Sequence, residues 1–334
     1  MSPHILAISG TSGAGKTTLI EAVIPRLAAR GLAVGVLKHD AHGLDLDRPG
    51  KDTHRLREAG AVRVEAFDGT WWFQVAPTPA GAGWDWLPAG FRRDVDILLV
   101  EGGKTGPMDK IWISGPGGGP DGSIERVIAI VGRGDAGLLE SSIVSWLESR
   151  WLEASRGAVV LAGGESRRMG RPKPSIPLAG GTLLDHVEGI ARSFAPEVLV
   201  AGPGHVPDAP GVPGPLGGIL AAMRWDPDRT WIVLACDMPR LRREVLDWLW
   251  SLRRPGTWAV IPLGPSSVPN ALVAVYEPQA ARLLEHAAAR GELSPCFILE
   301  KHPKVRIVEP PRDLMEALED VDTPEDLARL GGEG

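Results

Sequence analysis

The feature that most constrains the fold is a glycine-rich loop that directly follows a short apolar run, and it occurs twice in the 334 residues. The first loop is Gly10-Thr-Ser-Gly-Ala-Gly-Lys16, and the second is Gly163-Gly-Glu-Ser-Arg-Arg-Met-Gly170. A helical hydrophobic pattern follows each loop, which is typical of the first strand, loop and helix of an α/β domain. The length also allows two domains of roughly 150 residues. The sequence therefore predicts two α/β domains that begin in the same way.

Strand-like and helix-like segments alternate through both halves, which predicts an α/β fold for each, and in the first half they alternate as a parallel sheet with crossover helices requires. In the first half we expect strands at 4–9, 33–37, 62–67, 95–100 and 126–131, and helices at 16–30, 52–59 and 137–153. In the second half we expect strands at 157–162, 197–201, 230–235, 257–262 and 304–308, and helices at 181–193, 216–225, 241–253 and 278–290. The domains are predicted as 1–153 and 154–334. No Pro/Gly linker separates them, so a tight junction is expected.

Composition excludes several classes of protein. Hydrophobic residues make up 43% and charged residues 23%, which is ordinary for a globular protein that folds in water. No apolar run approaches the roughly 18 residues of a membrane span, and the first residues lack a secretory signal, so we expect a cytoplasmic protein without a membrane partner. A net charge of −6 gives no sign of a nucleic-acid surface. The two cysteines have no CxxC spacing, which argues against a disulfide framework or a zinc site.

Tryptophan is frequent, at 12 residues against one tyrosine. Four tryptophans, Trp71, Trp72, Trp84 and Trp86, fall in the Pro- and Gly-containing segment 67–92, which has neither helical nor strict strand spacing. The sequence gives no sharp prediction for this segment. We expect the tryptophans to fill cores and a domain interface rather than to stack on the base of a ligand.

The first loop matches the P-loop pattern in full, with a strand before it and a helix after it. Such a loop needs glycine so that backbone N–H groups converge on phosphate, a lysine that reaches the β- and γ-phosphates, and a hydroxyl that binds Mg²⁺. The alternative is a glycine turn that arose by chance. The predicted nucleotide contacts are Gly10, Gly13, Ala14, Gly15, Lys16, Thr17 and Thr18. The first domain is therefore predicted to be a P-loop NTPase-like sheet.

A carboxylate at the end of another strand usually completes the metal site of a P-loop. Glu101 ends the strand-like run at 95–100 and is the candidate, together with Thr17; the alternative is a solvated carboxylate. A polar loop that contains His39 and His42 could also bind metal or triphosphate, or these histidines could be ordinary loop residues.

The P-loop, the run from Lys38 to Ala61 and the phrase Leu-Val-Glu101-Gly-Gly-Lys104 resemble the MobB-type adaptors of molybdopterin-guanine dinucleotide biosynthesis over residues 3–150. The resemblance implies a GTP-binding, weakly hydrolysing and often dimeric protein that assists a guanylyltransferase. The family phrase is closer to Glu-Gly-Phe-Lys, and Gly103 replaces the aromatic residue here. No Asn-Lys-x-Asp element for guanine is evident.

The second loop differs in kind, because it lacks Gly-Lys-Thr and carries basic residues. Backbone amides and Arg167 could hold the β- and γ-phosphates of a triphosphate whose α-phosphate is attacked, while Lys173 neutralises the developing charge. Asp237 ends the strand-like run at 230–235, which is where an open α/β sheet binds its ligands. It is the predicted Mg²⁺ ligand, and the alternative is a helix N-cap before Pro239.

Four motifs of the second half resemble the MobA-type molybdenum cofactor guanylyltransferases over residues 156–331. They are Leu161-Ala-Gly-Gly-x-Ser-Arg-Arg-Met-Gly-x-x-Lys173, Gly214-Pro-Leu-Gly-Gly218, Cys236-Asp-Met-Pro239 and Val321-Asp-Thr-Pro-Glu-Asp-Leu327. The resemblance implies a Rossmann-like fold of the nucleotide-diphospho-sugar transferase type.

By position, the resemblance assigns guanine and ribose to Leu161, Ala162, Gly163 and Gly164, phosphates to Lys173, the nucleotide side of the pocket to Asp208, and Mg²⁺ to Asp237. The family often has Asn where this chain has Asp322. That carboxylate could become a second metal ligand or cap the helix that starts at Pro324.

Together the resemblances imply a reaction of GTP with molybdopterin, or its molybdenum form, that gives the guanine dinucleotide cofactor and pyrophosphate. GTP and Mg²⁺ are the expected ligands. Proteins that insert molybdopterin, apo-molybdoenzymes and a second copy bound through the first domain are the expected partners. Two alternatives stay open: a cytidylyltransferase on the same fold, and a GTP-regulated carrier of molybdopterin with a degraded transferase half.

Overall fold

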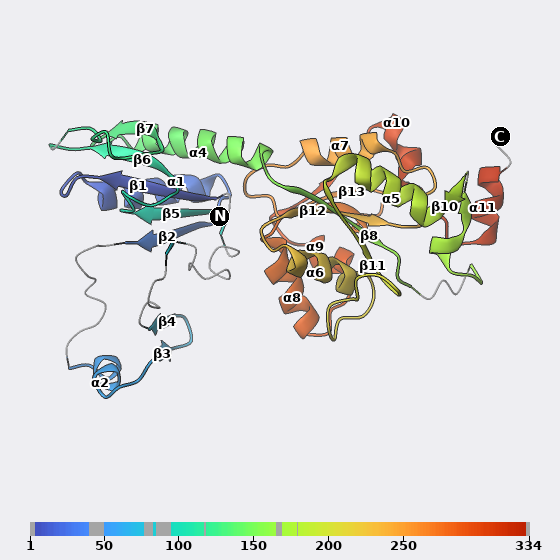
Figure 1. Cartoon of the computed structure of the whole chain (residues 1–334), viewed down its shortest axis with the longest axis horizontal. Coiled ribbons are helices and arrows are strands. Elements are labelled where there is room, and N and C mark those ends of the chain that lie inside the picture. Colours follow the sequence, from blue (N-terminus) through green and yellow to red (C-terminus); the bar gives the residue numbers. More distant parts are fainter. Residues whose placement is uncertain are drawn as a thin grey trace.

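The structure is a computed structural model that describes residues 4–39, 50–76, 83–84, 95–116, 118–164, 169–178 and 180–331. It contains two α/β domains, each built around its own sheet. The domains follow one another end to end along the long axis of the molecule (Figure 1). Among the described residues, no helix is both long and apolar enough to cross a bilayer.

The first domain has a five-stranded parallel sheet in the order β2-β5-β1-β6-β7. Its strands are β1 (Ile5–Gly10), β2 (Val34–Lys38), β5 (Ile97–Glu101), β6 (Asp109–Ser114) and β7 (Val127–Gly132). The central strands are apolar in nearly every position because helices or loops cover both of their faces. The helices α1 (Lys16–Ala29) and α4 (Ala136–Leu152) pack on one face, where Leu6, Ile8 and Trp146 belong to a common core.

One expectation for this sheet was wrong, and one of its strands was not predicted. The segment 62–67 does not join it: β3 (Val64–Phe67) pairs antiparallel with β4 (Trp72–Val75) in a separate two-stranded sheet. The Asp68 carboxylate accepts the N–H groups of Thr70 and Trp71, both at 2.6 Å, and so closes a local hairpin turn. This hairpin and α2 (Asp52–Glu58) project away from the parallel sheet (Figure 1). The fifth strand of the sheet is β6 instead of the segment 62–67, and β6 was not predicted from the sequence.

The second domain has a six-stranded mixed sheet in the order β11-β8-β12-β14-β13-β15. Its strands are β8 (Arg156–Leu161), β11 (Glu197–Ala201), β12 (Thr230–Ala235), β13 (Ala259–Pro262), β14 (Val273–Tyr276) and β15 (Val305–Val308). The unpredicted strand β14 runs antiparallel to both of its neighbours.

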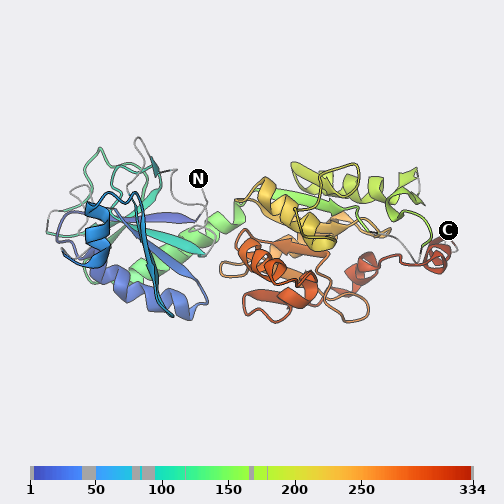
Figure 2. The same ribbon diagram turned by 90° about the horizontal axis from the view of Figure 1, so that it is seen from below.

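Helices cover both faces of this sheet (Figures 1 and 2). One face carries α5 (Leu183–Phe194) and α7 (Arg243–Ser251), and the other carries α6 (Pro215–Trp225) and α8 (Ala280–Ala289). The remaining short elements are η2 (Lys173–Ser175), β9 (Pro177–Leu178), β10 (Gly181–Thr182), α9 (Pro295–Leu299), α10 (Arg312–Met315), η3 (Glu316–Leu318) and α11 (Pro324–Gly331).

A polar contact joins the two domains. Asp96 is fully buried and accepts hydrogen bonds from the Ala33 N–H at 2.6 Å, from Trp258 Nε1 at 2.8 Å and from Lys304 Nζ at 2.6 Å. Nearby, Arg253 donates to the Trp151 carbonyl at 3.0 Å. The helix α4 ends and β8 begins on either side of the predicted boundary at 153 and 154, with three residues between them.

The domain interface lies at the amino ends of the parallel strands. Asp96 directly precedes β5 and Ala33 directly precedes β2, whereas Trp258 directly precedes β13 and Lys304 directly precedes β15. Both glycine-rich loops follow the carboxyl ends of their first strands, β1 and β8. The two loops therefore lie at opposite ends of the molecule and face away from each other.

The expectation that tryptophans fill cores and an interface holds for part of the set. Trp151 and Trp231 are buried, and Trp258 lies between the domains. Trp71 and Trp72 contradict it, because they are 76% and 61% exposed on the β3–β4 hairpin. Trp86 lies outside the described residues.

Candidate functional site

The first glycine-rich loop turns from β1 into α1. Gly13 and Gly15 have φ angles of 74° and 84°, a left-handed conformation that favours glycine. Gly15 directly precedes α1, and Ala14 is buried beneath the loop. An ideal Cβ atom on Gly10 would lie 2.6 Å from the Ile113 carbonyl oxygen, so β6 holds the start of the loop closely. The loop thus ends at a helix N-terminus, where backbone N–H groups attract anions.

Lys16 has no carboxylate within ion-pair distance among the described residues. Its Nζ donates to the carbonyl oxygens of the first two residues of the loop, at 3.3 and 2.9 Å. Burial lowers the pKa of Lys16, the Glu101 carboxylate opposes this, and the charges on Lys104 and Lys38 lower the pKa further. A phosphate would relieve this crowding of positive charge.

Thr17 and Glu101, the predicted metal pair of this loop, lie in contact. The Thr17 Oγ1 hydroxyl donates to Glu101 Oε1 at 2.6 Å, and Thr18 is exposed in the same helical turn. A hydroxyl and a carboxylate oxygen are suitable ligands for Mg²⁺. The backbone N–H of His39 donates to the Glu101 carbonyl at 3.0 Å. His42 lies outside the described residues.

An aromatic ring covers Gly103, the position at which the adaptor family carries an aromatic residue. An ideal Cβ atom on Gly103 would lie 3.3 Å from Trp84 Cη2. The same indole packs at 4.7 Å from the His39 ring. One tryptophan of the segment 67–92 therefore places an aromatic ring against Gly103, and this ring also packs on the apolar cluster that contains Ala7 and Val100.

The second glycine-rich loop opens a cavity of about 810 Å³ at the carboxyl ends of β8 and β12. Most of the predicted site residues line it, namely Leu161, Gly163, Gly164, Lys173, Asp208, Asp237 and Asp322. Ala162 is buried in the adjoining core. Arg167 lies outside the described residues, so its predicted phosphate contact stays a prediction.

The motif Gly214-Pro-Leu-Gly-Gly218 allows α6 to pack against this cavity. An ideal Cβ atom on Gly217 would lie 2.1 Å from the Val212 carbonyl oxygen, and one on Gly218 would lie 2.7 Å from Leu161 Cδ2. Asp208 packs against the same two glycines, and burial raises the pKa of its carboxyl. The paired glycines thus hold Asp208 at the wall of the cavity.

Lys173 lies between two carboxylates. Its Nζ donates to Asp237 Oδ2 at 2.7 Å and to Asp322 Oδ1 at 2.5 Å. Burial alone would lower the pKa of Lys173, but these two hydrogen bonds and charges outweigh it and raise the pKa. The structure thus brings together three predicted residues that are far apart in sequence, and it keeps the lysine charged.

A third carboxylate, Asp320, lies in this cluster and was not predicted from the sequence. Ligand oxygens of Asp237, Asp320 and Asp322 all lie within 4.8 Å of one another. Burial, with the charges of the other two carboxylates, raises the pKa of Asp320. The spacing of 320 and 322 was the available signal, since alternate residues of an extended segment share a face. Three carboxylates fit a Mg²⁺ ion, which prefers oxygen ligands.

The cap of α11 is not Asp322. Thr323 Oγ1 accepts the Asp326 N–H at 3.2 Å, and the Asp326 carboxylate accepts the Thr323 N–H at 2.8 Å. This reciprocal capping box leaves the Asp322 carboxylate facing Lys173. Of the two alternatives for Asp322, capping therefore fails.

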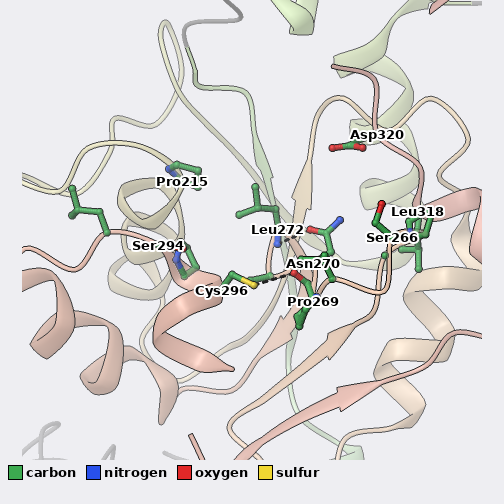
Figure 3. A pocket seen from close by; sticks show the side chains of 15 residues that line it. Pro215, Ser266, Pro269, Asn270, Leu272, Ser294, Cys296, Leu318 and Asp320 are labelled. Carbon is green, nitrogen blue, oxygen red and sulfur yellow. Dashed lines mark hydrogen bonds between the residues drawn. The ribbon is translucent and has the colours of Figure 1, made fainter. Parts of the chain in front are cut away.

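A second cavity of about 540 Å³ adjoins the first, because Pro215 and Leu272 line both. Figure 3 shows Pro215, Ser294 and Cys296 on one side of it and Leu318 and Asp320 on the other. Asn270 contributes an amide, whose Oδ1 accepts the Leu272 N–H at 3.1 Å. The second cavity therefore combines apolar walls with amide, hydroxyl and carboxylate groups, and it reaches the carboxylate cluster through Asp320.

Comparison with known proteins matches the two halves of the chain to two different families. Residues 5–133 match the family described as Molybdopterin guanine dinucleotide synthesis protein B. Residues 158–305 match the family described as MobA-like NTP transferase domain.

Individual relatives follow the same division. The chain is 43% identical over 110 residues to the molybdopterin-guanine dinucleotide biosynthesis adapter protein of Haemophilus influenzae, a match that covers 33% of this chain and 62% of that protein. The chain therefore spans less than two thirds of that relative. With the adapter protein of Escherichia coli it shares 39% identity over 118 residues, which covers 34% of this chain and 67% of that protein.

The second domain has relatives of its own. A protein of Mycobacterium bovis named "Probable molybdenum cofactor guanylyltransferase" is 36% identical over 166 residues, which covers 45% of this chain and 82% of that protein. The chain thus belongs to the MobB family over its first domain and to the MobA-like NTP transferase family over its second, and it joins the two in one polypeptide.

Proposed function

We propose that the second domain transfers GMP from GTP to molybdopterin, or to its molybdenum form, and releases pyrophosphate. The observation that carries this proposal is the placement of Lys173 between Asp237 and Asp322 in the cavity that follows the β8 loop. A charged lysine beside a carboxylate cluster suits a reaction in which negative charge builds on a phosphate. The family membership supports a nucleotidyltransferase, and the relatives' names support guanine.

The proposed reaction is a direct displacement. A terminal phosphate oxygen of molybdopterin attacks the α-phosphorus of GTP, the bond between the α-phosphorus and the bridging oxygen breaks, and pyrophosphate leaves. Lys173 neutralises charge on the phosphates, and Arg167 assists it as predicted from the sequence. The segment from Leu161 to Gly164 meets the guanine and ribose, with Asp208 on the nucleotide side. No protein nucleophile is needed.

Mg²⁺ is the proposed cofactor, and the carboxylates of Asp237 and Asp322, with Asp320 beside them, would hold it. When bound, it would neutralise phosphate charge and activate the α-phosphorus. Lys173 would then exchange its carboxylate partners for phosphate oxygens. This exchange would leave the lysine charged throughout.

The adjoining cavity is the proposed place of the acceptor. It is lined in part by apolar side chains such as Leu272 and in part by polar groups such as Asn270 and Ser294, a mixture that suits a flat polar ring system. Because Asp320 borders it, an acceptor bound there would have its phosphate near the carboxylate cluster.

For the first domain we propose GTP binding at Lys16, with Thr17 and Glu101 on the Mg²⁺ side and weak hydrolysis at most. Proteins that insert molybdopterin and apo-molybdoenzymes are proposed partners, and so is a second copy bound through this domain. The exposed aromatic residues of the β3–β4 hairpin support self-association, since large apolar side chains exposed together often mark an interface. A cytoplasmic location stays a prediction.

The experiment is pyrophosphate release from the full chain with molybdopterin and Mg²⁺, with GTP and CTP compared side by side. Asp237→Ala tests the metal ligand, and Asp313→Ala is the matched control at an exposed aspartate of the same domain. Release with GTP alone, lost in Asp237→Ala, supports the proposal. Preference for CTP would mean that the nucleotide substrate carries cytosine instead of guanine. No release with either nucleotide would favour the alternative of a GTP-regulated molybdopterin carrier.

A further inference from the structure

Arg133 lies against the first glycine-rich loop, although the sequence analysis did not single it out. An ideal Cβ atom on Gly15 would lie 3.5 Å from Arg133 Cγ and 3.7 Å from Arg133 Nε. The side chain is exposed and, within the part of the chain that the structure describes, makes no hydrogen bond, ion pair or ring contact. A guanidinium in this position beside a P-loop is available to an anion.

The strand order places Arg133 on the opposite side of the loop from the metal pair. Because all five strands are parallel, their carboxyl ends meet at one edge of the sheet. Glu101 ends β5 on one side of β1, whereas Arg133 follows β7 on the other side. A nucleotide bound with its γ-phosphate near Glu101 would have its α-phosphate and nucleoside further from Glu101, and Arg133 lies on that side of the loop.

The turn that carries Arg133 is fixed at both ends. The Asp135 N–H donates to the Gly132 carbonyl at 3.1 Å, and the Asp135 carboxylate caps α4 by accepting the Leu138 N–H at 2.9 Å. Gly134 has a φ of 84°, which completes the turn. The backbone of this turn is therefore ordered before a ligand binds, and only the Arg133 side chain has to be ordered on binding.

We propose that Arg133 contacts the α- and β-phosphates of the nucleotide bound at the first site. Gly15 belongs to the loop whose backbone N–H groups surround these phosphates, so a guanidinium beside Gly15 lies within reach of the same oxygens. This inference rests on the proposed function of the first domain, namely that its P-loop binds GTP. It adds a residue from the end of β7 to a site otherwise formed by β1, α1 and β5.

The test is equilibrium binding of fluorescent GDP and GTP to the full chain, with Lys173→Ala present throughout to weaken the second site. Arg133→Ala should weaken both nucleotides about tenfold, since a charge-assisted hydrogen bond is lost. Arg133→Lys should recover part of the loss because it keeps the charge but not the planar guanidinium. The matched control is Arg30→Ala, at the far end of α1, which should leave both affinities unchanged. Thermal unfolding of each variant checks that the fold is intact.

Lys16→Ala separates the failure of this inference from the failure of the proposed function. If Lys16→Ala abolishes binding while Arg133→Ala leaves it unchanged, the role of Arg133 is overturned and the proposed P-loop site stands. A loss confined to GTP would place Arg133 at the γ-phosphate and overturn its proposed position. If Lys16→Ala and the unmutated loop bind equally, both the inference and the proposed GTP site are wrong.

Discussion

The two lysines that serve the two glycine-rich loops have opposite surroundings. Lys16 is held by carbonyl oxygens of its own loop, and burial and neighbouring lysines lower its pKa. Lys173 is held by Asp237 and Asp322, and these carboxylates raise its pKa. The first site therefore has an excess of positive charge before any ligand binds, whereas the second site has more carboxylates than cations among its described residues.

This difference shows what each site requires. The first can accept a phosphate directly, because the anion meets N–H groups and a lysine that, among the described residues, is not ion-paired with a carboxylate. The second must first have its carboxylates neutralised, which is the task expected of a divalent cation. This contrast supports the proposal that the first site binds a nucleotide and that the second carries out a metal-dependent transfer.

The largest expected effect comes from removing the lysine of the second site. Lys173→Ala should lower the rate of pyrophosphate release by about 100-fold or more, since a positioned charge on the reacting phosphate is lost. Lys301→Ala, an exposed lysine of the same domain, is the control and should keep the rate. An active Lys173→Ala protein would mean that Lys173 only balances the two aspartates.

The next effect concerns the contact that keeps the two regions together. Asp96→Asn should lower the free energy of unfolding by about 3 kcal/mol, because Lys304 loses a buried partner. Asp52→Asn makes the same change at a side chain that is 95% exposed and should have almost no effect. Calorimetric unfolding measures both. Because Asp96 lies at the amino ends of the strands, we expect nucleotide affinity at both loops to persist; a loss at either loop would show that the sites depend on the interface.

A smaller change sharpens the contrast between the two lysines. Asp322→Asn removes one charge next to Lys173 but keeps an oxygen ligand, so kcat/KM should fall by less than about tenfold and more Mg²⁺ should be required. The Mg²⁺ dependence of pyrophosphate release measures this, with Asp313→Asn as the control. If Asp322→Asn is as inactive as Asp237→Ala, the charge of Asp322 is as important to the reaction as the Asp237 carboxylate, and the smaller effect expected here is wrong.

The smallest effect is a pH dependence at the domain interface. His4 packs 4.6 Å from the Trp151 ring, and burial, together with the charge of Arg253, lowers its pKa from 6.5 to about 3. The unfolded chain takes up a proton below pH 6.5 and the folded chain does not, so stability is present above that pH and is lost as the pH falls.

Between pH 7.5 and 5.5 this linkage should lower the free energy of unfolding by about 1 kcal/mol. The measurement is urea unfolding at both pH values, and His4→Gln should remove this part of the pH dependence. His205→Gln changes an exposed histidine and should retain it. An unchanged pH dependence in His4→Gln would contradict the assignment.

The two fold types and most of the site residues could be predicted because their signals are contiguous in sequence. A P-loop is a single run of eight residues, and Asp237 is the second residue after the apolar strand β12. The hairpin of β3 and β4 also had a local signal, because Asp68-Gly69 lies between two strand-like runs. This signal was not used, since the alternation of strands and helices in the first half suggested that 62–67 belonged to the parallel sheet.

Other features depend on long-range pairing and could not be predicted in this way. The strand β14 lies between β12 and β13 only because the chain reverses direction there, and no local pattern gives that order. Arg133 and Gly15 are 118 residues apart in sequence, and only the parallel sheet brings them into contact. The meeting of Lys173 with Asp322, separated by 149 residues, has the same origin.

The central claim is that one chain holds two separate nucleotide sites at opposite ends of the molecule. The most direct test is the number of GTP molecules bound per chain at saturation in the presence of Mg²⁺ and without acceptor. Two are expected for the unmutated protein, and one for Lys16→Ala. A single GTP in the unmutated protein, or two in Lys16→Ala, would contradict the account.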